Sequence, residues 1–470
     1  MRSVYRQELR LILLSLAAKI SLLLLTTLAA MAVWVGIGEV GRQHATIERQ
    51  AAMQVDDIAR VAKQNAGSAD PGDGAYYTFH GTWDPPSPLA FAALGLRDVA
   101  PFALRVRALS LQAQLYESEA LNPESALAGR FDYFFVLVYL APLFVIALFH
   151  DIRSGEQEGG RLQMLRSLSR RETALWTRRA VLRFGLLFLA LAVPFVVGAI
   201  VSSVPVRPLC FAVGVTALYL AFWCALSLGV ASLPGSSAAH AARLLGAWTM
   251  LTLVLPTLAH LAIHNAIPTQ SVVDLALAHR EAVHGAWEQP PEEVMQRFAA
   301  SHPRLRGQVA LGPDFEWKWY FAFHQVADES VAAQAAHYRE ALLERQRWTA
   351  RVGVFVPAVA VNVLMHRIAA TDLPAQLDYQ SRIQAFHDRL RAFYYPYIFD
   401  KRPFVEADYW KAPRFAPQAS AGTINVLSLA ALLCVAGLAS VLALLAIRRE
   451  RGMQPRHWGT ESEALGTSAV

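Results

Sequence analysis

The sequence predicts a mostly α-helical membrane protein with six transmembrane helices and two extracytoplasmic insertions, the first mixed α and β and the second mainly α-helical. Hydrophobic residues make up 54% of the 470 residues and charged residues only 17%, whereas a soluble domain usually carries about 25% charged residues. The apolar residues are also grouped into long runs, and a helix needs roughly 20 mostly apolar residues to cross a bilayer. This composition excludes a disordered chain and a collagen-like chain.

Six apolar runs have the length of a membrane span. Because backbone polar groups inside a bilayer must be satisfied within their own segment, each run is expected to be a helix. In chain order the runs cover residues 11–37, 131–149, 184–204, 209–233, 244–267 and 424–447. The first run follows a basic leader like that of a secretory signal, but it is far longer than the roughly 7–15 apolar residues of a signal core. We therefore expect a retained anchor.

The positions of the arginines predict which side each loop faces. Arginines occur in the N-terminal tail, in the loops after the second and fourth runs and in the tail after the sixth run. These four segments share one side of the membrane, which the positive-inside tendency assigns to the cytoplasm together with both termini. The expected order is tail and first helix 1–38, first extracytoplasmic domain 39–130, second helix 131–149, cytoplasmic loop 150–183, third to fifth helices 184–267, second extracytoplasmic domain 268–422, sixth helix 423–447 and cytoplasmic tail 448–470.

The first extracytoplasmic segment opens with a helical pattern. Residues 41–64 contain no proline and have apolar side chains at helical spacing, so this helix is expected to continue the first span outward. Residues 67–74 predict a loop, and residues 76–80 predict a short strand. The proline-rich stretch 83–88 must be extended or turning, and residues 104–119 lead back to the membrane as a strand or a helix.

The second extracytoplasmic segment is mainly helical by pattern. Helices are expected at residues 272–288, from Pro290-Pro291-Glu292-Glu293 onward, at 315–351, and at 375–395 with an end at Pro396. Residues 352–365 are apolar, but this stretch is too short to span a bilayer. It is expected to be buried in the outer domain or to lie on the membrane surface.

The loop between the second and third runs has the most specific pattern. After a glycine break, Leu162, Leu165 and Leu168 recur every three residues, with Arg161 before them and Arg166 among them. This spacing predicts a short amphipathic helix that lies at the membrane face or binds a soluble partner. Glu156 and Glu158 form a close acidic pair in this basic loop and are expected to pair with a cation on a partner or with a neighbouring arginine. A loop that only fixes the topology is the alternative interpretation.

No motif of a catalytic site is found, and the chain by itself is not expected to be an enzyme. A Walker A motif needs lysine followed by serine or threonine, but the five lysines are followed by Ile, Gln, Trp, Arg and Ala. Cys210, Cys224 and Cys434 lie inside apolar runs and form no metal or disulfide pattern. His260 and His264 share a helix face and are weak candidates for a metal site. Packed or interfacial histidines are the simpler interpretation, so no metal is expected.

The loop also resembles a known family. Its pattern E-x-E-x-G-x-L, followed by leucines and S-x-S-R-R, is similar to the first cytoplasmic loop of ABC-2 type transporter permeases. In that family this loop docks on a separate ATPase. The resemblance therefore implies ATPase-coupling positions at Glu156, Glu158, Gly160, Leu162, Leu165 and Arg170.

A second resemblance covers nearly the whole chain. The stretches T-W-D-P-P-S-P-L-A-F from Thr82, L-G-L-R-D-V from Leu94, N-P from Asn122, G-R-F-D from Gly129, F-V-P-A from Phe355 and A-T-D from Ala370 look like an ABC-2 subgroup with a large uncharacterised outer region. That subgroup is similar to the membrane subunit of the nitrous-oxide-reductase maturation transporter. The resemblance implies a bacterial cytoplasmic-membrane permease that exports a substrate or transmits force for maturation of an extracytoplasmic protein.

The resemblance also implies partners. These are a cytoplasmic P-loop ATPase that binds ATP and Mg²⁺, a second permease copy or paralogue, and membrane lipid; a periplasmic partner is left open. No cofactor on this chain and no nucleic acid are expected. Two other functions stay open, namely a membrane-anchored receptor or sensor, whose short cytoplasmic segments leave little room for an output domain, and an intramembrane metal enzyme, which lacks convergent carboxylates.

Overall fold

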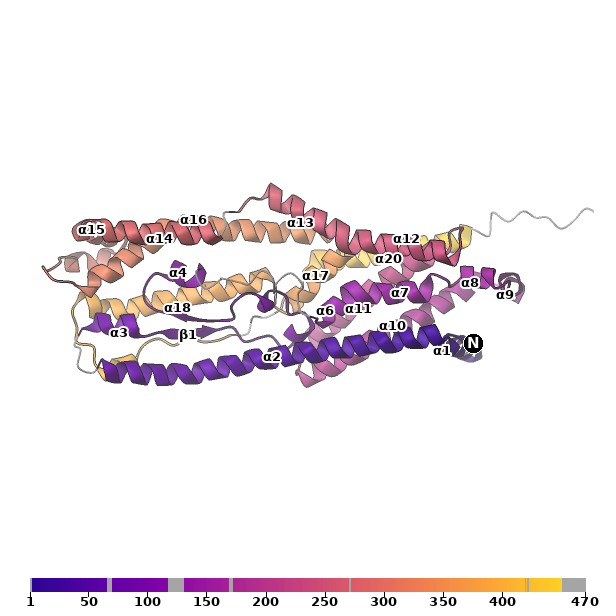
Figure 1. Cartoon of the computed structure of the whole chain (residues 1–470), viewed down its shortest axis with the longest axis horizontal. Coiled ribbons are helices and arrows are strands. Elements are labelled where there is room, and N and C mark those ends of the chain that lie inside the picture. The colour runs from indigo at the N-terminus through magenta and orange to yellow at the C-terminus, as the bar shows by residue number, and fades with distance from the viewer. Residues whose placement is uncertain are drawn as a thin grey trace, which may run out of the picture.

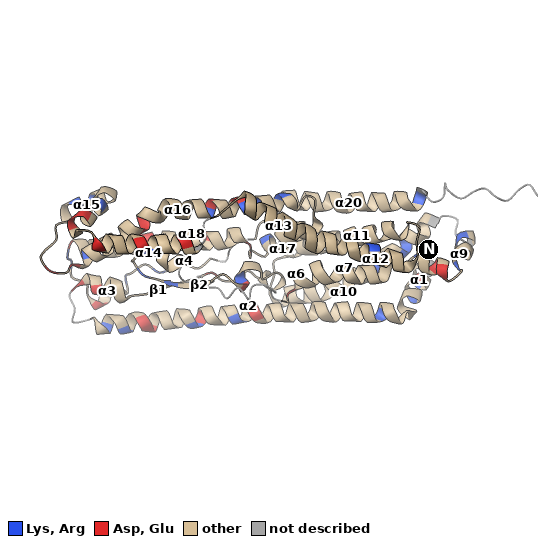
Figure 2. Cartoon of the chain, turned by 45° about the horizontal axis from the view of Figure 1, so that its top comes forward, with Lys and Arg blue, Asp and Glu red and all other residues tan. Residues whose placement is uncertain are grey.

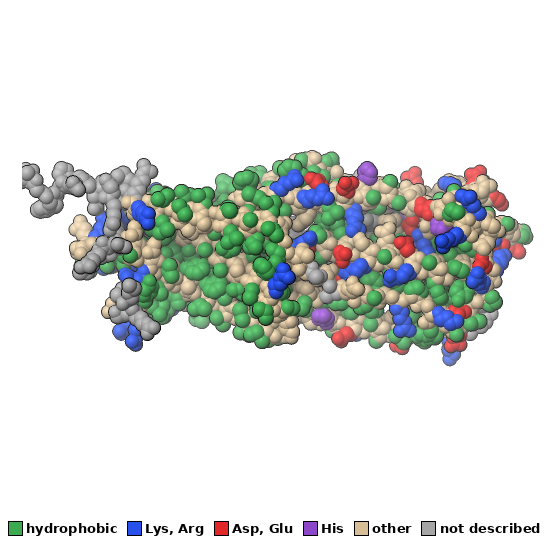
Figure 3. All heavy atoms as spheres, turned by 180° about the vertical axis from the view of Figure 1, so that it is seen from behind, with side chains coloured by type: hydrophobic (Ala, Val, Ile, Leu, Met, Phe, Trp, Pro, Cys, Tyr) green, Lys and Arg blue, Asp and Glu red, His purple; other side chains and the backbone are tan. Residues whose placement is uncertain are grey.

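The computed structural model describes residues 2–65, 70–116, 131–168, 172–269, 272–418, 420 and 422–449. Its helices run roughly parallel to one long axis and form two halves that follow each other along that axis (Figure 1). One half, called the apolar half, has a surface made mostly of hydrophobic side chains, while the other, called the charged half, bears most of the charged ones (Figure 3). A belt of exposed apolar surface on this scale is typical of contact with lipid.

The apolar half is built from six helices that are long and apolar enough to cross a membrane, counted over the described residues. The six predicted runs are therefore confirmed as helices, and the chain has the architecture of a multi-pass membrane protein. In chain order they are α2 (Leu16–Gln64), α6 to α8 (Tyr133–Glu158), α10 (Glu172–Val201), α11 (Val206–Ala231), α12 to α13 (Ser237–Ala266) and α20 (Val426–Arg449).

Two of these helices contain a wide π-helical turn. The turn η4 (Val136–Leu140) precedes α7 (Ala141–Phe149), and η5 (Met250–Val254) joins α12 (Ser237–Thr249) to α13 (Leu255–Ala266). A proline, Pro142 or Pro256, lies two residues after the end of each turn. Proline cannot donate a backbone hydrogen bond to the preceding turn, so the helix widens locally there.

The first span continues far outside the apolar half, as predicted. Helix α2 holds 49 residues without interruption, which corresponds to a length of about 74 Å. It is preceded by α1 (Arg2–Leu14), and the break between them falls at Ser15, whose side chain accepts a hydrogen bond from the backbone N–H of Ala18. Helix α2 therefore belongs to both halves.

The charged half combines α2 with short elements from residues 71–116 and with the helices of residues 272–409. The short elements are α3 (Pro71–Tyr77), β1 (His80–Trp83), the 3₁₀ turns η1 (Ala90–Ala92) and η2 (Gly95–Asp98), β2 (Ala103–Val106) and α4 (Leu111–Tyr116). The helices are α14 (Val272–Glu288), α15 (Pro291–Ser301), η6 (Pro303–Gln308), α16 (Trp317–Val352), α18 (Leu373–Phe399) and α19 (Glu406–Tyr409). Between α16 and α18, α17 (Pro357–Ile368) packs with the apolar half. Strands β1 and β2 pair antiparallel, with His80 opposite Val106.

Most of the predicted outer helices are confirmed, but three local predictions are wrong. Residues 71–77 form a helix instead of a loop, because Asp70 caps it through Gly72 N–H and Pro71 starts it. The strand lies at residues 80–83 instead of 76–80. Helix α18 passes through Pro396 and ends at Phe399, because proline removes only the hydrogen bond of its own backbone nitrogen and does not prevent the next residues from continuing the helix.

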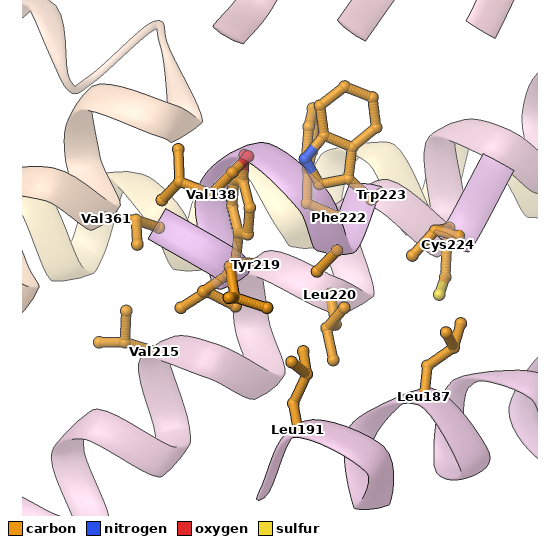
Figure 4. Packing of buried hydrophobic residues seen from close by; sticks show 14 of the residues in the cluster. Val138, Leu187, Leu191, Val215, Tyr219, Leu220, Phe222, Trp223, Cys224 and Val361 are labelled. Carbon is orange, nitrogen blue, oxygen red and sulfur yellow. The ribbon is translucent and has the colours of Figure 1, made fainter. Parts of the chain in front are cut away.

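The short apolar stretch around Pro357 is buried, but it packs into the core of the apolar half instead of the outer domain. Helix α17 packs against α11 and α20, and its side chains join the core of the apolar half. Figure 4 shows Val361 of α17 near Val215 and Tyr219 of α11, with Leu191 of α10 below them. A separate aromatic core fills the charged half, where Phe298, Phe321, Phe386 and Tyr394 are fully buried.

Candidate functional site

The loop singled out by the sequence lies at the tip of the apolar half, away from the charged half (Figure 1). It folds into two short helices, α8 (Ser154–Glu158) and α9 (Leu162–Leu168). Gly160, between them, has φ = +69°, a left-handed conformation that favours glycine. The predicted glycine break followed by a short helix is therefore confirmed.

Glu156 ties α8 to two other elements. One carboxylate oxygen accepts a hydrogen bond from Arg179 of α10 at 2.9 Å, and the other accepts one from Arg161 at 2.7 Å. Arg179 is buried, and its Nε also donates to Glu8 of α1 at 3.1 Å. Of the two partners expected for this carboxylate, the structure shows neighbouring arginines. The result is a chain of ion pairs that runs from α1 through α10 to α8.

Glu158 ties the other end of α8 to α12. Its carboxylate accepts hydrogen bonds from the backbone N–H of Ser237 at 2.8 Å and from the Ser237 hydroxyl at 3.0 Å. Ser237 is the first residue of α12, where unpaired backbone N–H groups favour a carboxylate. The two motif carboxylates therefore attach α8 to α10 and α12, Glu156 from a half-buried position and Glu158 from an exposed one.

Leu162 and Leu165 of α9 point inward. Leu162 is buried in the core of the apolar half, and Leu165 packs against the same core. Gln163 and Met164 are exposed, so α9 is amphipathic as predicted, and its polar side faces outward. Arg170 lies outside the described residues.

A broad groove opens beside α8 and α9 at this tip and is called the end groove. It has a volume of about 1440 Å³ and lies between α8–α9, the turn that joins α11 to α12, and the last turns of α20. Apolar side chains of Leu233, Leu442 and Leu445 line it together with Arg153 and Arg166, and no carboxylate is among its described lining residues. Sequence reasoning missed the α11–α12 turn and the end of α20, because only the tertiary packing brings them beside the loop.

The outer motif residues meet at the junction between the two halves. The Asp132 carboxylate accepts a hydrogen bond from the backbone N–H of Leu94 at 2.9 Å, and the Thr371 hydroxyl donates to the carbonyl of Ala93 at 2.7 Å. Phe91 from the same loop packs in the core of the apolar half against Phe195 of α10. These positions hold the two halves together. The motif residues at 122, 123, 129 and 130 lie outside the described residues.

The histidine pair of α13 gains no third ligand. The rings of His260 and His264 have centroids 6.2 Å apart, and both side chains are exposed. The described part of the chain contains no group of three or more His, Cys, Asp or Glu side chains that could hold a metal ion. The two histidines remain a pair on one helix face.

The sequence did not reveal a buried polar cluster inside the charged half. Asp328 of α16 accepts hydrogen bonds from Arg391 of α18 at 2.8 Å and from Leu111 N–H of α4 at 2.7 Å, and His279 of α14 lies 3.3 Å away. Burial opposes ionisation of Asp328, but His279 and Arg391 outweigh it and lower the pKa to about 2. Burial also lowers the pKa of His387, on α18, to about 3. This cluster joins four helices and is structural in character.

The fold and the end groove define a multi-pass helical membrane protein in which ion pairs and hydrogen bonds attach a short two-helix loop to the spanning helices. Within this chain, residues 273–418 match the profile of a family described as "Domain of unknown function (DUF3526)". The matched stretch covers α14 to α19 and therefore most of the charged half. No curated protein and no solved structure matches the chain.

Proposed function

We propose that the chain is the membrane-spanning permease subunit of an ABC-2 type transporter and that a separate cytoplasmic ATPase binds the end groove. The observation that carries the proposal is the double attachment of α8, through Glu156 to α10 and through Glu158 to α12. A segment tied by ion pairs and hydrogen bonds to two spanning helices moves together with them. Movement of a partner bound beside α8 would therefore be passed directly to the membrane helices.

The orientation in this proposal places the end groove in the cytoplasm of a bacterium and the charged half outside its cytoplasmic membrane. Basic residues gather at the end of the apolar half that holds α1 and α9 (Figure 2), as the positive-inside tendency requires for a cytoplasmic face. Both termini are then cytoplasmic. Residues 39–130 and 268–422 form the two extracytoplasmic insertions.

In this proposal, ATP hydrolysis and the membrane path belong to different subunits. The ATPase subunit binds ATP and Mg²⁺, and this chain supplies the end groove and the spanning helices. A second permease copy or a paralogue is expected beside it, supported by the very low burial of the α12–α13 span, which is the least packed of the six. The ATP-driven step then exports a substrate, removes a lipid-phase substrate or transmits force to an extracytoplasmic partner. The uninterrupted helix α2 supports the last of these three.

The test is purification of the tagged full chain from native membranes in a mild detergent, followed by identification of the bound proteins and an assay of ATP hydrolysis. A stoichiometric P-loop ATPase is expected with the wild-type chain. Gln163→Trp fills the end groove from an exposed position and should remove the ATPase. The matched control Gln7→Trp changes an exposed glutamine of α1 outside the groove and should retain it.

Recovery of the folded wild-type chain without any ATPase would contradict the proposal. That outcome would favour a membrane-anchored receptor or sensor, whose ligand would bind the charged half. Equal loss of the ATPase from both tryptophan variants would contradict the assignment of the end groove.

A further inference from the structure

A second cavity, called the outer pocket, lies in the charged half, far from the end groove. Its walls are α2 around Val55, strand β1 at Trp83, helix α18 at Phe386 and the segment 409–415. The mouth is open, because the side chains of Val55 and Trp410 are 48% and 40% exposed. The pocket is therefore accessible from solvent and is bounded by four different elements.

The interior of the outer pocket is apolar, and two polar side chains in its walls, Gln54 and His80, are already hydrogen-bonded within the protein. Gln54 uses both ends of its amide, since Nε2 donates to the carbonyl of Phe79 at 2.7 Å and Oε1 accepts from Gly81 N–H at 2.6 Å. The buried His80 ring forms a hydrogen bond with the Tyr394 hydroxyl at 3.1 Å, and burial lowers its pKa to about 4, so it is neutral at pH 7. An apolar occupant would therefore leave no wall group unsatisfied.

The rim of the outer pocket bears one cation and no carboxylate. Arg414 is exposed, and it forms no ion pair with the described residues. Arg414 is the only charged side chain among the described residues that line the pocket. Asp408, six positions before it, already accepts a hydrogen bond from Lys411 at 2.7 Å. An anion at the rim would thus meet a positive charge within the pocket lining.

The size of the cavity limits the length of the occupant. The volume of the outer pocket is about 210 Å³, and a cavity of about 150 Å³ holds a benzene molecule, so a short alkyl chain fits. We propose that the outer pocket binds the alkyl chain of an aliphatic carboxylate, with the carboxylate at Arg414. Octanoate, with seven carbons beyond its carboxylate, is a probe of this class.

The position of the pocket gives such binding a mechanical consequence. One wall is α2, which continues without a break into the first membrane span. The opposite wall, residues 409–415, precedes the sixth span, α20, by a short connection. An occupant between these walls therefore contacts segments that lead to the first and last spans. The inference goes beyond the proposed ATPase docking and does not depend on it.

The test uses the full chain in nanodiscs of zwitterionic lipid, with sodium octanoate as the probe and tryptophan fluorescence as the readout, since Trp83 and Trp410 line the pocket. A saturable change is expected with a dissociation constant of about 1 mM. Val55→Phe fills the mouth from a half-exposed position and should abolish the saturable change. Arg414→Gln should weaken octanoate binding roughly fivefold, as expected for one exposed charge pair. It should leave binding of 1-octanol unchanged.

The matched control is Arg297→Gln, which removes an exposed arginine of α15 remote from the pocket and should bind octanoate like the wild type. All substituted side chains are exposed or half-exposed, so circular dichroism and gel filtration should show unchanged folding. The proposal is overturned by any of three results: no saturable signal up to about 10 mM octanoate, an undiminished signal in Val55→Phe, or identical octanoate affinity in Arg414→Gln.

Discussion

The two halves of the molecule are held together by different contacts. The core of the apolar half is a continuous set of aliphatic and aromatic side chains with few hydrogen bonds, such as those between Tyr133 and Thr216 at 3.2 Å and from Tyr219 to the carbonyl of Val138 at 3.1 Å. The charged half instead depends on buried ionic groups, including Asp328 with Arg391 and Asp84 with Arg97.

This difference indicates how each half should fail. A buried charge that loses its partner is left desolvated without compensation, which is far more costly than the loss of one neutral hydrogen bond. Between lipid-surrounded helices, a single hydrogen bond contributes little, because packing supplies most of the association. The charged half should therefore respond to polar substitutions and to pH, while the core among the spanning helices should tolerate both.

The largest effect is expected for Asp328→Ala. The substitution leaves Arg391 buried without its carboxylate and should cost about 3–5 kcal/mol of unfolding free energy. Limited proteolysis at increasing temperature should cut the charged half first and spare the spanning helices. The control Asp378→Ala removes a largely exposed partner of Arg382 and should cost less than about 1 kcal/mol. Equal protease resistance of the two variants would contradict the comparison.

Acidification is expected to have the next largest effect. Burial lowers the pKa of His324 and of His387 from 6.5 to about 3, so the folded state opposes their protonation. Their contribution to stability is complete above pH 6.5 and is lost as the pH falls toward 3. Asp328 has a pKa lowered to about 2, so its contribution to stability is also lost as the pH falls below 3.8.

Thermal melting of the charged half between pH 7.5 and pH 4.5 checks this expectation. The melting temperature should fall steadily with pH, and the double variant His324→Gln/His387→Gln should show a smaller dependence over the same range. A melting temperature that stays constant or rises on acidification would show that the buried histidines do not control the stability of this half.

The junction between the halves gives an intermediate effect. A Cβ atom at Gly36 would lie 2.0 Å from the backbone carbonyl oxygen of Phe91, so Gly36→Ala must displace the loop that enters the apolar half. We expect a loss of about 1–3 kcal/mol in the unfolding free energy. Gly38→Ala, two residues further along the same helix, meets nothing within 4 Å and should stabilise the chain by about 0.5–1 kcal/mol. The pair can be compared by thermal unfolding in one detergent, and a loss of similar size in both variants would refute close approach at residue 36.

The smallest effect is expected inside the apolar half. Tyr219→Phe removes the hydroxyl that donates to the carbonyl of Val138 and should cost only about 0.6 kcal/mol. Unfolding in a graded denaturing detergent should distinguish this value from the effect of Asp328→Ala. A loss as large as that of Asp328→Ala would mean that polar contacts stabilise both halves alike.

The sequence predicts the parts of this fold that depend on local pattern. The six spans follow from apolar run length alone, and α14 and α16 follow from helical spacing and from the proline and acidic residues at helix starts. Helix α3 was missed because two of its seven residues are glycines, which predict a loop. A Cβ at Gly72 would lie 2.0 Å from Trp317, so the glycine there is required by a side chain distant in the sequence. No local pattern records that contact.

The candidate sites divide in the same way. Glu156 and Glu158 could be singled out as an acidic pair in a basic loop, but their partners could not. Glu158 contacts Ser237, 79 positions further along the chain, and the end groove and the outer pocket each need walls from separate elements. Such sites exist only once the helices have packed against one another.

The most direct test of the central claim is photocrosslinking from the end groove in native membranes. A photoreactive phenylalanine analogue in place of Gln163 should form an adduct with a P-loop ATPase, and the same analogue in place of Gln7 should not. Adducts from position 163 that contain no ATPase, in membranes where the chain is folded, would contradict docking of an ATPase at this groove.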